Sequence, residues 1–229
     1  STEGKIESAK SKSINKSASP SGHAIKKKPV YDFFKRIFDI VCSLVALIIL
    51  SPVFLILASL VKATSEGPVF FVHRRVGKGG KTLNIYKFRS MVTNAEELIR
   101  QFTPEQKAEY ERNFKLEDDP RVTRVGKFMR KTSLDELPQL FNILKGDISV
   151  VGPRPVMEVE TEIYGNYRDM LLSVKPGLTG FWAANGRSCT TYTRRRAMEI
   201  CYIKNRSVCF DLKIILKTIT SVFKGEGAV

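Results

Sequence analysis

At residues 130–139 the chain reads RKTSLDELPQ, and the rest of the sequence is best interpreted outward from this stretch. Two carboxylates, Asp135 and Glu136, stand side by side after a run of cations and just before Pro138. Adjacent residues on a regular helix point about 100° apart, so the two carboxylates do not face each other by default. Their roles therefore depend on where the local helix begins.

Two helix starts are compatible with these residues. Ser133 and Glu136 have the spacing of a capping box with Ser133 as the N-cap. Pro138 argues against this start, because it would fall inside the helix and remove a hydrogen bond. If the helix begins near Asp135, Pro138 lies in the first turn, where no amide proton is needed. The carboxylates would then lie at a positive helix end, which keeps them ionised and attracts phosphate. An ionised aspartate is a usable nucleophile toward phosphorus.

The composition indicates one folded domain with a strong positive charge. The chain has 229 residues, and its 38 Lys and Arg against 23 Asp and Glu give a formal net charge of +15. This charge favours polyanionic partners, namely nucleic acid, anionic lipid headgroups or phosphorylated substrates. The two histidines, His23 and His73, are too isolated to predict a zinc site. The four cysteines lack metal-type spacing and, with no cleavable signal peptide expected, are interpreted as reduced thiols.

The N-terminal segment combines a basic tail with an apolar run. Residues 1–30 are rich in Ser and Lys and predict a disordered basic tail. Residues 31–63 contain a nearly continuous apolar run of about 25 residues, which as a helix would reach ~37 Å and could span a hydrocarbon core. A transmembrane helix is therefore the default interpretation of this segment.

Ser51-Pro52 complicates that interpretation. Pro52 removes a backbone hydrogen bond and predicts a kink in the middle of the segment. A broken helix can enter and leave a bilayer by the same face if its freed carbonyls find partners. Basic residues stand at both ends, Lys35-Arg36 before the run and Lys62 after it, and they fit both ends lying on the cytoplasmic side.

Further motifs follow the 130–139 stretch. The chain continues as SLDELPQLFN at 133–142, LKGD at 144–147 and VGPRP at 151–155. In this order the motifs resemble those of the bacterial sugar transferase family, the monotopic polyprenyl-phosphate sugar-1-phosphate transferases, also called phosphoglycosyl transferases. The resemblance runs from about Phe34 to Val222. It implies the re-entrant form for residues 31–63, with Ser51 and Pro52 as the hinge.

The resemblance also implies a reaction. A UDP-sugar would transfer sugar-1-phosphate to a polyprenyl phosphate, expected to be undecaprenyl phosphate, and release UMP. Asp135 would be the nucleophile, passing through a phosphosugar-aspartyl intermediate, and Glu136 would orient or deprotonate the acceptor. Mg²⁺ is the expected cofactor, with Asp135 as its protein ligand beside the diphosphate.

Basic and aromatic side chains are the expected substrate contacts. Lys87 stands at the position of the family's active-site lysine. Arg154 lies between two prolines, so its planar guanidinium is held rigidly, which suits phosphate binding. Arg130 is expected to hold phosphate oxygens, Arg187 to pair with the nucleotide and Trp182 to stack on it or lie in the core. Ala183-Ala184 stand where many family members carry a glutamine, which leaves the sugar and nucleotide preference open.

The remaining pattern predicts a helix-rich α+β fold. It comprises the re-entrant N-terminal membrane helix, a small β element of strands near 69–72 and 83–86, and amphipathic interfacial helices in a cytosolic catalytic domain, residues 64–229. Thr103-Pro104 is expected to open a helix, and Asp118-Asp119 is interpreted as a solvated turn in preference to a metal site. Residues 210–223 are amphipathic and fit either packing on the domain or lying in the membrane interface.

The expected location is the bacterial inner membrane, with the catalytic domain on its cytoplasmic face. The expected partners are a UDP-sugar, a polyprenyl phosphate and an anionic phospholipid bilayer, with no nucleic acid, because the apolar segment argues against it. The sequence does not decide whether the protein forms a homodimer. Two rivals remain: a non-catalytic basic protein that binds membranes through charge, and an integral-membrane transferase with a spanning helix and different chemistry.

Overall fold

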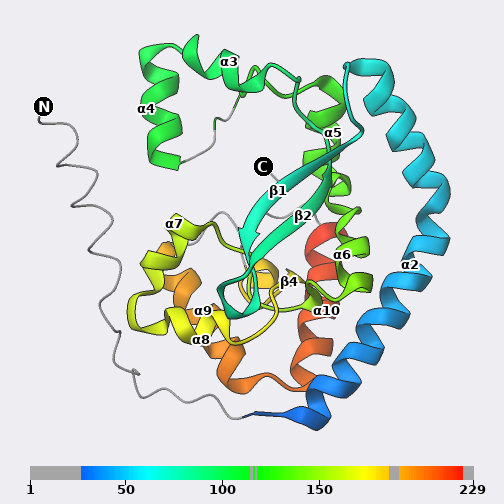
Figure 1. Ribbon diagram of the computed structural model, residues 1–229, viewed down its shortest axis with the longest axis vertical. Helices are drawn as coiled ribbons and strands as arrows, with labels where there is room; N and C mark the ends of the chain where they lie inside the picture. Colours follow the sequence, from blue (N-terminus) through cyan, green and yellow to red (C-terminus); the bar gives the residue numbers. More distant parts are fainter. Residues whose placement is uncertain (1–26, 114–115, 117, 186–190, 224–229) are drawn as a thin grey trace, which may run out of the picture.

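The computed structural model describes residues 27–113, 116, 118–185 and 191–223. One long helix runs along one side of the molecule, and a β-hairpin crosses the middle of the molecule (Figure 1). The prediction of a helix-rich α+β fold is confirmed. The predicted basic tail, residues 1–30, lies almost entirely outside the described residues.

The elements follow in chain order. The described helices are α2 (Pro29–Thr64), α3 (Ala95–Arg100), α4 (Pro104–Asn113), α5 (Arg124–Thr132), α6 (Gln139–Lys145), α7 (Glu158–Thr161), α8 (Arg168–Leu172), α9 (Tyr192–Asn205) and α10 (Val208–Phe223). The strands are β1 (Phe70–Val76), β2 (Thr82–Phe88), β3 (Ser149–Val151) and β4 (Gly177–Thr179). The 3₁₀ turns are η1 (Lys78–Gly80), η2 (Leu134–Glu136), η3 (Glu162–Tyr167) and η4 (Ala183–Asn185).

Helix α2 is the apolar segment, and among the described helices it alone is long and apolar enough to cross a membrane. The expected break at Pro52 is not seen, because the helix continues through it and curves gently along its length (Figure 1). Proline cannot donate to the carbonyl four residues earlier, which is that of Ile48. The Ser51 hydroxyl donates to this same carbonyl at 2.8 Å. Ser51 therefore satisfies the acceptor that Pro52 leaves unpaired, which explains how the helix stays continuous.

The first half of α2 is fixed to the rest of the molecule by polar side chains. Arg36 donates from Nη1 to the Ile143 carbonyl at 2.6 Å and from Nη2 to the Leu144 carbonyl at 2.7 Å, which caps the C-terminal end of α6. Asp39 is buried, and its Oδ1 accepts hydrogen bonds from the Ser149 hydroxyl at 3.0 Å and the Val150 amide at 2.9 Å. The start of β3 is thereby held against the helix.

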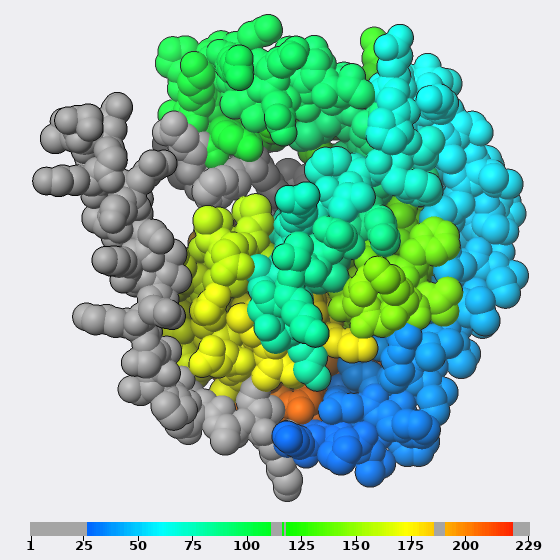
Figure 2. Space-filling model, in the orientation of Figure 1, coloured from blue at the N-terminus to red at the C-terminus, as the bar shows by residue number. Residues whose placement is uncertain are grey.

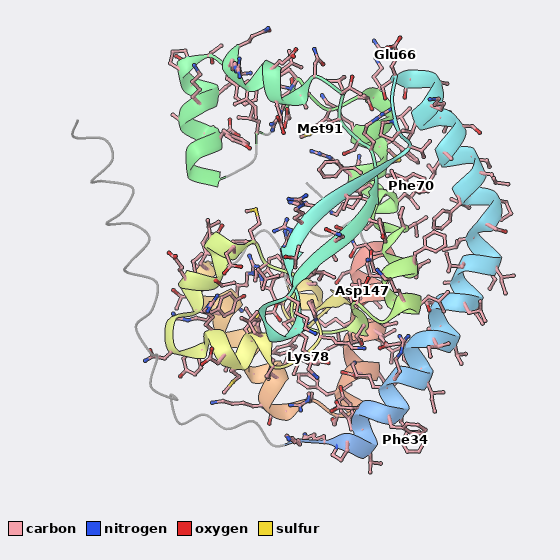
Figure 3. The ribbon with its side chains drawn as sticks, in the orientation of Figure 1. Phe34, Glu66, Phe70, Lys78, Met91 and Asp147 are labelled. Carbon is pink, nitrogen blue, oxygen red and sulfur yellow. The ribbon has the colours of Figure 1, made fainter. Side chains whose placement is uncertain are left out.

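The second half of α2 packs through apolar contacts. Leu57 and Val61 are buried in one cluster with Phe88 of β2 and Met129 of α5. Both halves of α2 therefore contact the same domain. On the opposite side of the helix, large apolar side chains are exposed; Phe34 points away from the body of the molecule (Figure 3). The helix is thus covered by protein on one side only.

The predicted hairpin forms between β1 and β2, which pair antiparallel over seven residues each. Its register places Phe71 opposite Lys87, His73 opposite Ile85 and Arg75 opposite Leu83. Paired residues and those two positions apart lie on one face of a hairpin. Basic side chains of both strands therefore share one face. In Figure 2 a recess separates the α3–α4 segment from this hairpin.

The C-terminal half forms the largest core cluster. Its parallel strands β3 and β4 pair beside α9 and α10, whose Tyr202, Ile203 and Ile214 are buried there. On α10, Leu212 and Leu216 are exposed, so the helix has apolar side chains on both faces. The two interpretations of residues 210–223 are therefore compatible: one face packs on the domain, and the other is free to meet an apolar surface.

The prediction of a solvated turn at Asp118-Asp119 is wrong for its second carboxylate. Asp119 is buried and accepts two hydrogen bonds from Arg121, at 2.8 Å from Nε and 2.7 Å from Nη2. The Arg121 guanidinium lies 5.2 Å from the ring centroid of Phe102 and 5.1 Å from that of Tyr110. This planar fork therefore ties the α3–α4 segment to the chain that leads into α5, a role that a short acidic run does not reveal.

Candidate active site

The acidic pair lies on a short turn between two helices. Helix α5 ends at Thr132, and Ser133 takes a left-handed conformation with φ of 58°. Asp135 and Glu136 occupy the 3₁₀ turn η2, and α6 begins only after Pro138. The capping-box interpretation is wrong, because the Ser133 side chain makes no capping hydrogen bond. A helix starting near Asp135 is also not what forms: this part of the chain is a single 3₁₀ turn, and Pro138 precedes the α-helix.

Lys87 joins both carboxylates. Its Nζ donates to Glu136 Oε1 at 2.7 Å and lies 3.9 Å from Asp135 Oδ2. Lys87 comes from the end of β2, and the turn η2 packs directly against that strand. Asp135 is buried, whereas the Glu136 side chain is 37% exposed. The site therefore holds one shielded and one accessible carboxylate beside a shared cation.

The protonation of Asp135 is set by opposing effects. Burial raises its pKa, the nearby charge of Lys87 lowers it, Glu136 raises it and Arg130 lowers it. The net shift is upward, so desolvation outweighs the cations. This differs from the expectation that a helix end keeps the carboxylate strongly ionised. The cations instead limit the cost of burying a charge.

Arg130 is positioned by a residue that the sequence did not single out. Its Nε donates to the Ser90 hydroxyl at 2.9 Å, and burial lowers the pKa of the guanidinium. The Ser90 carbonyl accepts the Thr123 amide at 3.0 Å, and a Cβ at Gly126 would lie 2.0 Å from this oxygen. Helix α5 therefore approaches Ser90 closely only because residue 126 is glycine. Ser90 stands three residues after Lys87, and this closeness in sequence is the only feature that could have pointed to a role for Ser90.

The residues around Asp135 suit an Mg²⁺ ion that is held jointly by the protein and the substrate phosphates. They do not form a metal site built from protein ligands alone. Among the described residues no group of three or more His, Cys, Asp or Glu side chains converges in a metal-binding arrangement. Asp135 and Glu136 supply two carboxylates. Mg²⁺ in phosphate-transfer sites commonly uses one or two carboxylates plus substrate phosphates and water. The donor set present is of that kind.

Arg154 belongs to a second group of cations. Its guanidinium carbon lies 5.4 Å from the ring centroid of Trp182, and that of Arg195 lies 4.9 Å from it. Arg195 and Arg75 both pair with Glu160, at 3.4 Å and 3.1 Å. Nothing in the sequence except charge predicted a role for the other members of this group, Arg75, Glu160 and Arg195. They come from β1, α7 and α9 and are brought together only by the fold.

The backbone of Arg154 is held by Glu199. The Arg154 amide donates to Glu199 Oε1 at 3.0 Å, and this carboxyl group is fully buried. Burial raises the pKa of Glu199 to about 7. Arg187, the remaining predicted substrate contact, lies outside the described residues. Of Ala183-Ala184, the second is buried within η4, next to the Trp182 position.

Comparisons with known proteins place the chain among sugar transferases. The model of the family described as bacterial sugar transferase matches residues 30–225. The undecaprenyl-phosphate galactose phosphotransferase of Salmonella typhimurium is 48% identical over 200 residues, covering 86% of this chain and 42% of that protein. Exopolysaccharide production protein ExoY of Sinorhizobium fredii is 44% identical over 204 residues, covering 88% of this chain and 90% of that protein. The UDP-glucose:undecaprenyl-phosphate glucose-1-phosphate transferase of Klebsiella pneumoniae is 43% identical over 207 residues, covering 85% and 41%.

The chain thus spans less than half the length of two of these relatives and most of the length of ExoY. The family match includes α2, the hairpin, the acidic turn and both groups of cations. A match over this share of the sequence, together with relatives above 40% identity, identifies the family. The chain belongs to the bacterial sugar transferase family.

Proposed function

We propose that this protein is a membrane-bound phosphoglycosyl transferase that moves sugar-1-phosphate from a UDP-sugar to undecaprenyl phosphate and releases UMP. The observation that carries the proposal is the buried Asp135 carboxylate, held 3.9 Å from Lys87 Nζ and next to Glu136. The printed names of relatives that use undecaprenyl phosphate support the acceptor. Such a transfer opens the assembly of a lipid-linked glycan such as an exopolysaccharide, a capsule or an O-antigen.

The first step uses Asp135 as the nucleophile. A carboxylate oxygen attacks the sugar-linked phosphorus, the bond from that phosphorus to the bridging oxygen breaks, and UMP leaves with the electron pair. The product is an acyl phosphate, a mixed anhydride in which the Asp135 carboxylate carries the sugar phosphate. In the second step an oxygen of the lipid phosphate attacks the same phosphorus and releases the carboxylate. A fixed nucleophile allows a soluble donor and a lipid acceptor to use one site in turn.

Neighbouring side chains support both steps. Lys87 lies against both carboxylates and would neutralise charge on the transferred phosphoryl group. Glu136 is the more exposed carboxylate and would orient or deprotonate the acceptor phosphate. Arg130, held by Ser90, is the further cation whose charge acts on Asp135. Asp135 and Glu136 would hold Mg²⁺ with the donor diphosphate; when bound, the ion would offset repulsion between the anions.

The membrane attachment proposed is re-entrant. The contacts of both halves of α2 with one domain support it, because a helix that crossed the bilayer would carry one end away from that domain. The exposed apolar side of α2 would face lipid, and the basic N-terminal segment with Lys35 and Lys62 would remain at the cytoplasmic surface of the inner membrane. No break at Ser51-Pro52 is needed for this, because the continuous, gently curved helix already keeps both of its halves against one domain.

Purified full-length protein in lipid nanodiscs tests the chemistry through UMP release. Asp135→Asn should lower turnover by roughly 10³-fold or more, because the amide is a poor nucleophile. Asp118→Asn, the same change at an exposed carboxylate, is the matched control and should leave turnover unchanged. Equal activity of both variants would favour the alternative hypothesis, a transferase whose chemistry does not use Asp135. A non-catalytic membrane-binding protein would release no UMP at all.

The identity of the transferred sugar has to be determined by experiment. The relatives' names specify galactose, N-acetylgalactosamine and glucose, so membership of the family leaves the sugar open. A screen of UDP-sugars for UMP release would identify the donor. The same preparation, analysed by mass photometry in nanodiscs, would decide whether a homodimer forms.

A further inference from the structure

Three arginines from different elements converge around Trp182 and Glu160. Arg75 comes from β1, Arg154 from the loop after β3 and Arg195 from α9. Arg154 and Arg195 both lie against the Trp182 ring, and Arg75 and Arg195 share Glu160. A small surface depression beside Arg195 is lined by Arg195 itself, its partner Glu160, and Ile163, Tyr164 and Tyr192. We call Arg75, Arg154 and Arg195 the arginine cluster.

The charges of the arginine cluster are not balanced by the acids around it. Glu160 is the ionised partner: although burial acts in the other direction, the Met157 amide and the arginines hold its pKa below the usual range. Glu199, the other acid, is fully buried with a pKa raised to about 7, so near neutral pH it is only partly ionised. Burial and Arg154 lower the pKa of Arg75 to about 10, which still leaves it charged. Three cations thus face between one and two negative charges.

Part of the hydrogen-bonding capacity of Arg154 and Arg195 is also unused. Nε and Nη2 of Arg195 and Nε of Arg154 are buried without a partner of normal geometry among the described residues, although the Tyr164 hydroxyl lies close to Arg195. Arg195 is only 8% exposed. Buried guanidinium donors without partners are costly, and an oxyanion is the group that satisfies them.

The hairpin connects this cluster to Asp135. Along one face, Lys87 lies opposite Phe71, and His73 and Arg75 follow two and four residues later. At about 3.4 Å per residue, the backbone of Arg75 lies roughly 14 Å along the strand from the Lys87 position. His73 lies between them and is neutral at pH 7, because burial and the surrounding Arg75, Lys87 and Arg154 lower its pKa to about 4. The two phosphates of a diphosphate share one bridging oxygen, so the long side chains have to close this gap between backbone positions. Their charged ends do approach one another, because Arg75, Lys87 and Arg154 all lower the pKa of His73 and the charge of Glu136 acts on Arg75.

We propose that the arginine cluster binds the phosphate that stays with the nucleotide, so that the nucleoside monophosphate half of the donor lies beside Trp182 while its sugar-linked phosphate lies at Asp135. The inference rests on the proposed function for the identity of the donor. It assigns two separate phosphate subsites, and it makes Arg75 and Arg195 binding residues for the leaving nucleotide. Glu199 is a positioning residue that holds the Arg154 backbone, whereas Glu160 occupies guanidinium donors that the phosphate would take over.

Trp182 provides a direct readout, because it is the only tryptophan in the chain. UMP added to the full-length protein in nanodiscs, without donor or acceptor, should change Trp182 fluorescence in a saturable way. Arg195→Gln should weaken UMP binding roughly 10- to 100-fold, the range expected for lost charge-assisted hydrogen bonds. Arg194→Gln, the same change at the exposed neighbouring position, should leave the affinity unchanged. In turnover, Arg195→Gln should raise the donor KM by a similar factor and leave the acceptor KM unchanged.

A merely structural role for Arg195 makes a different prediction. If the cluster only held α9 to α7, Glu160→Gln would damage the protein as Arg195→Gln does, since both break the same ion pair. If the cluster binds an anion, Glu160→Gln removes a competing negative charge, and UMP affinity should be retained or increased. Arg195→Lys, which keeps the charge, should recover part of the lost affinity.

The outcomes separate this inference from the proposed function. UMP release by the wild type together with unchanged UMP affinity in Arg195→Gln overturns the inference and leaves the function standing. Equal loss of affinity in Arg195→Gln and Glu160→Gln also overturns it. Arginine-dependent UMP binding by a protein that transfers nothing to undecaprenyl phosphate would contradict the function and support the subsite.

Discussion

The chemistry proposed at Asp135 depends on a balance between burial and charge. Burial raises the pKa of this carboxyl, and Lys87 and Arg130 act against it. A nucleophile must be ionised, yet a carboxylate that is partly desolvated is more reactive than one stabilised by water. The same cations that keep Asp135 usable would contact the phosphoryl group as its charge develops.

The pH dependence of the transfer follows from this balance. As the pH falls through the raised pKa of Asp135, the nucleophile becomes protonated, so kcat/KM for the donor should decline at a higher pH than the ordinary aspartate value of about 3.9 would give. Lys87→Gln removes the cation that lowers the pKa, so the acidic limb should move to higher pH. Lys62→Gln, an equal charge change on α2, should not move the limb in the pH–rate profile. A limb that stays in place in Lys87→Gln would contradict this account of Asp135.

Ser90 offers a second test at the residue scale. Ser90→Ala removes the hydroxyl that accepts from Arg130 Nε at 2.9 Å, so the guanidinium loses one fixed contact. Turnover should fall roughly tenfold, the effect of one hydrogen bond to a charged group. Ser173→Ala, which removes a hydroxyl bonded to the Met170 carbonyl, should leave turnover unchanged. Full activity in Ser90→Ala would show that Arg130 needs no such support.

At the scale of elements, α2 acts as a structural frame for the site. Arg36 caps the end of α6, and α6 begins directly after the turn that carries Asp135. Asp39 fixes the start of β3, which leads into the Arg154 loop. Leu57 and Val61 pack under the end of β2, next to Lys87. The apolar helix therefore positions three segments that carry site residues.

This arrangement predicts that α2 contributes to stability through its polar side. Arg36→Gln removes two short hydrogen bonds from a charged group to helix-end carbonyls and should lower the free energy of unfolding by about 2–3 kcal/mol. Thermal denaturation in nanodiscs, followed by circular dichroism, measures the change. Lys62→Gln, whose Nζ makes one exposed contact to the Gly67 carbonyl at 3.3 Å, should shift stability much less. Similar losses in both variants would indicate that capping of α6 is unimportant.

Sequence patterns predicted which helices and strands exist better than they predicted where each one begins and ends. The apolar run, the β-hairpin and the helix opened by Thr103-Pro104 are all present, since each carries a local signal of periodicity, turn or cap. The acidic turn was predicted wrongly in detail. Both interpretations assumed an α-helix, whereas Ser133 adopts a left-handed conformation that residue type alone does not predict for serine.

The candidate site shows the same division. Lys87, Asp135 and Glu136 lie in motifs that resemble the family, and the structure brings them together. Arg75 and Arg195 are 120 positions apart in the numbering, and only the fold places both on Glu160. Asp119 was interpreted as solvated because nothing in the sequence shows that Arg121 folds back onto it. Long-range pairing of charges is what local patterns could not supply.

At the scale of the whole molecule, the exposed apolar side of α2 and the strong positive charge favour attachment to an anionic membrane. The proposed re-entrant attachment would place both ends of α2 on one side of the membrane. Single cysteines at Lys27 and Glu66, in a background without the four native cysteines, should both resist a membrane-impermeant maleimide in intact cells. Both should react once the inner membrane is permeabilised. Labelling of the Lys27 position alone in intact cells would support a spanning helix.

The central claim is that one aspartyl oxygen, at Asp135, carries the phosphosugar between the two substrates. Its most direct test is mass spectrometry of the protein incubated with the preferred UDP-sugar in the absence of lipid acceptor. The account predicts a mass increase of one sugar phosphate on the peptide containing Asp135, and its disappearance when undecaprenyl phosphate is added. Formation of lipid-linked product by a protein that never carries this adduct, under conditions that trap acyl phosphates, would contradict the account.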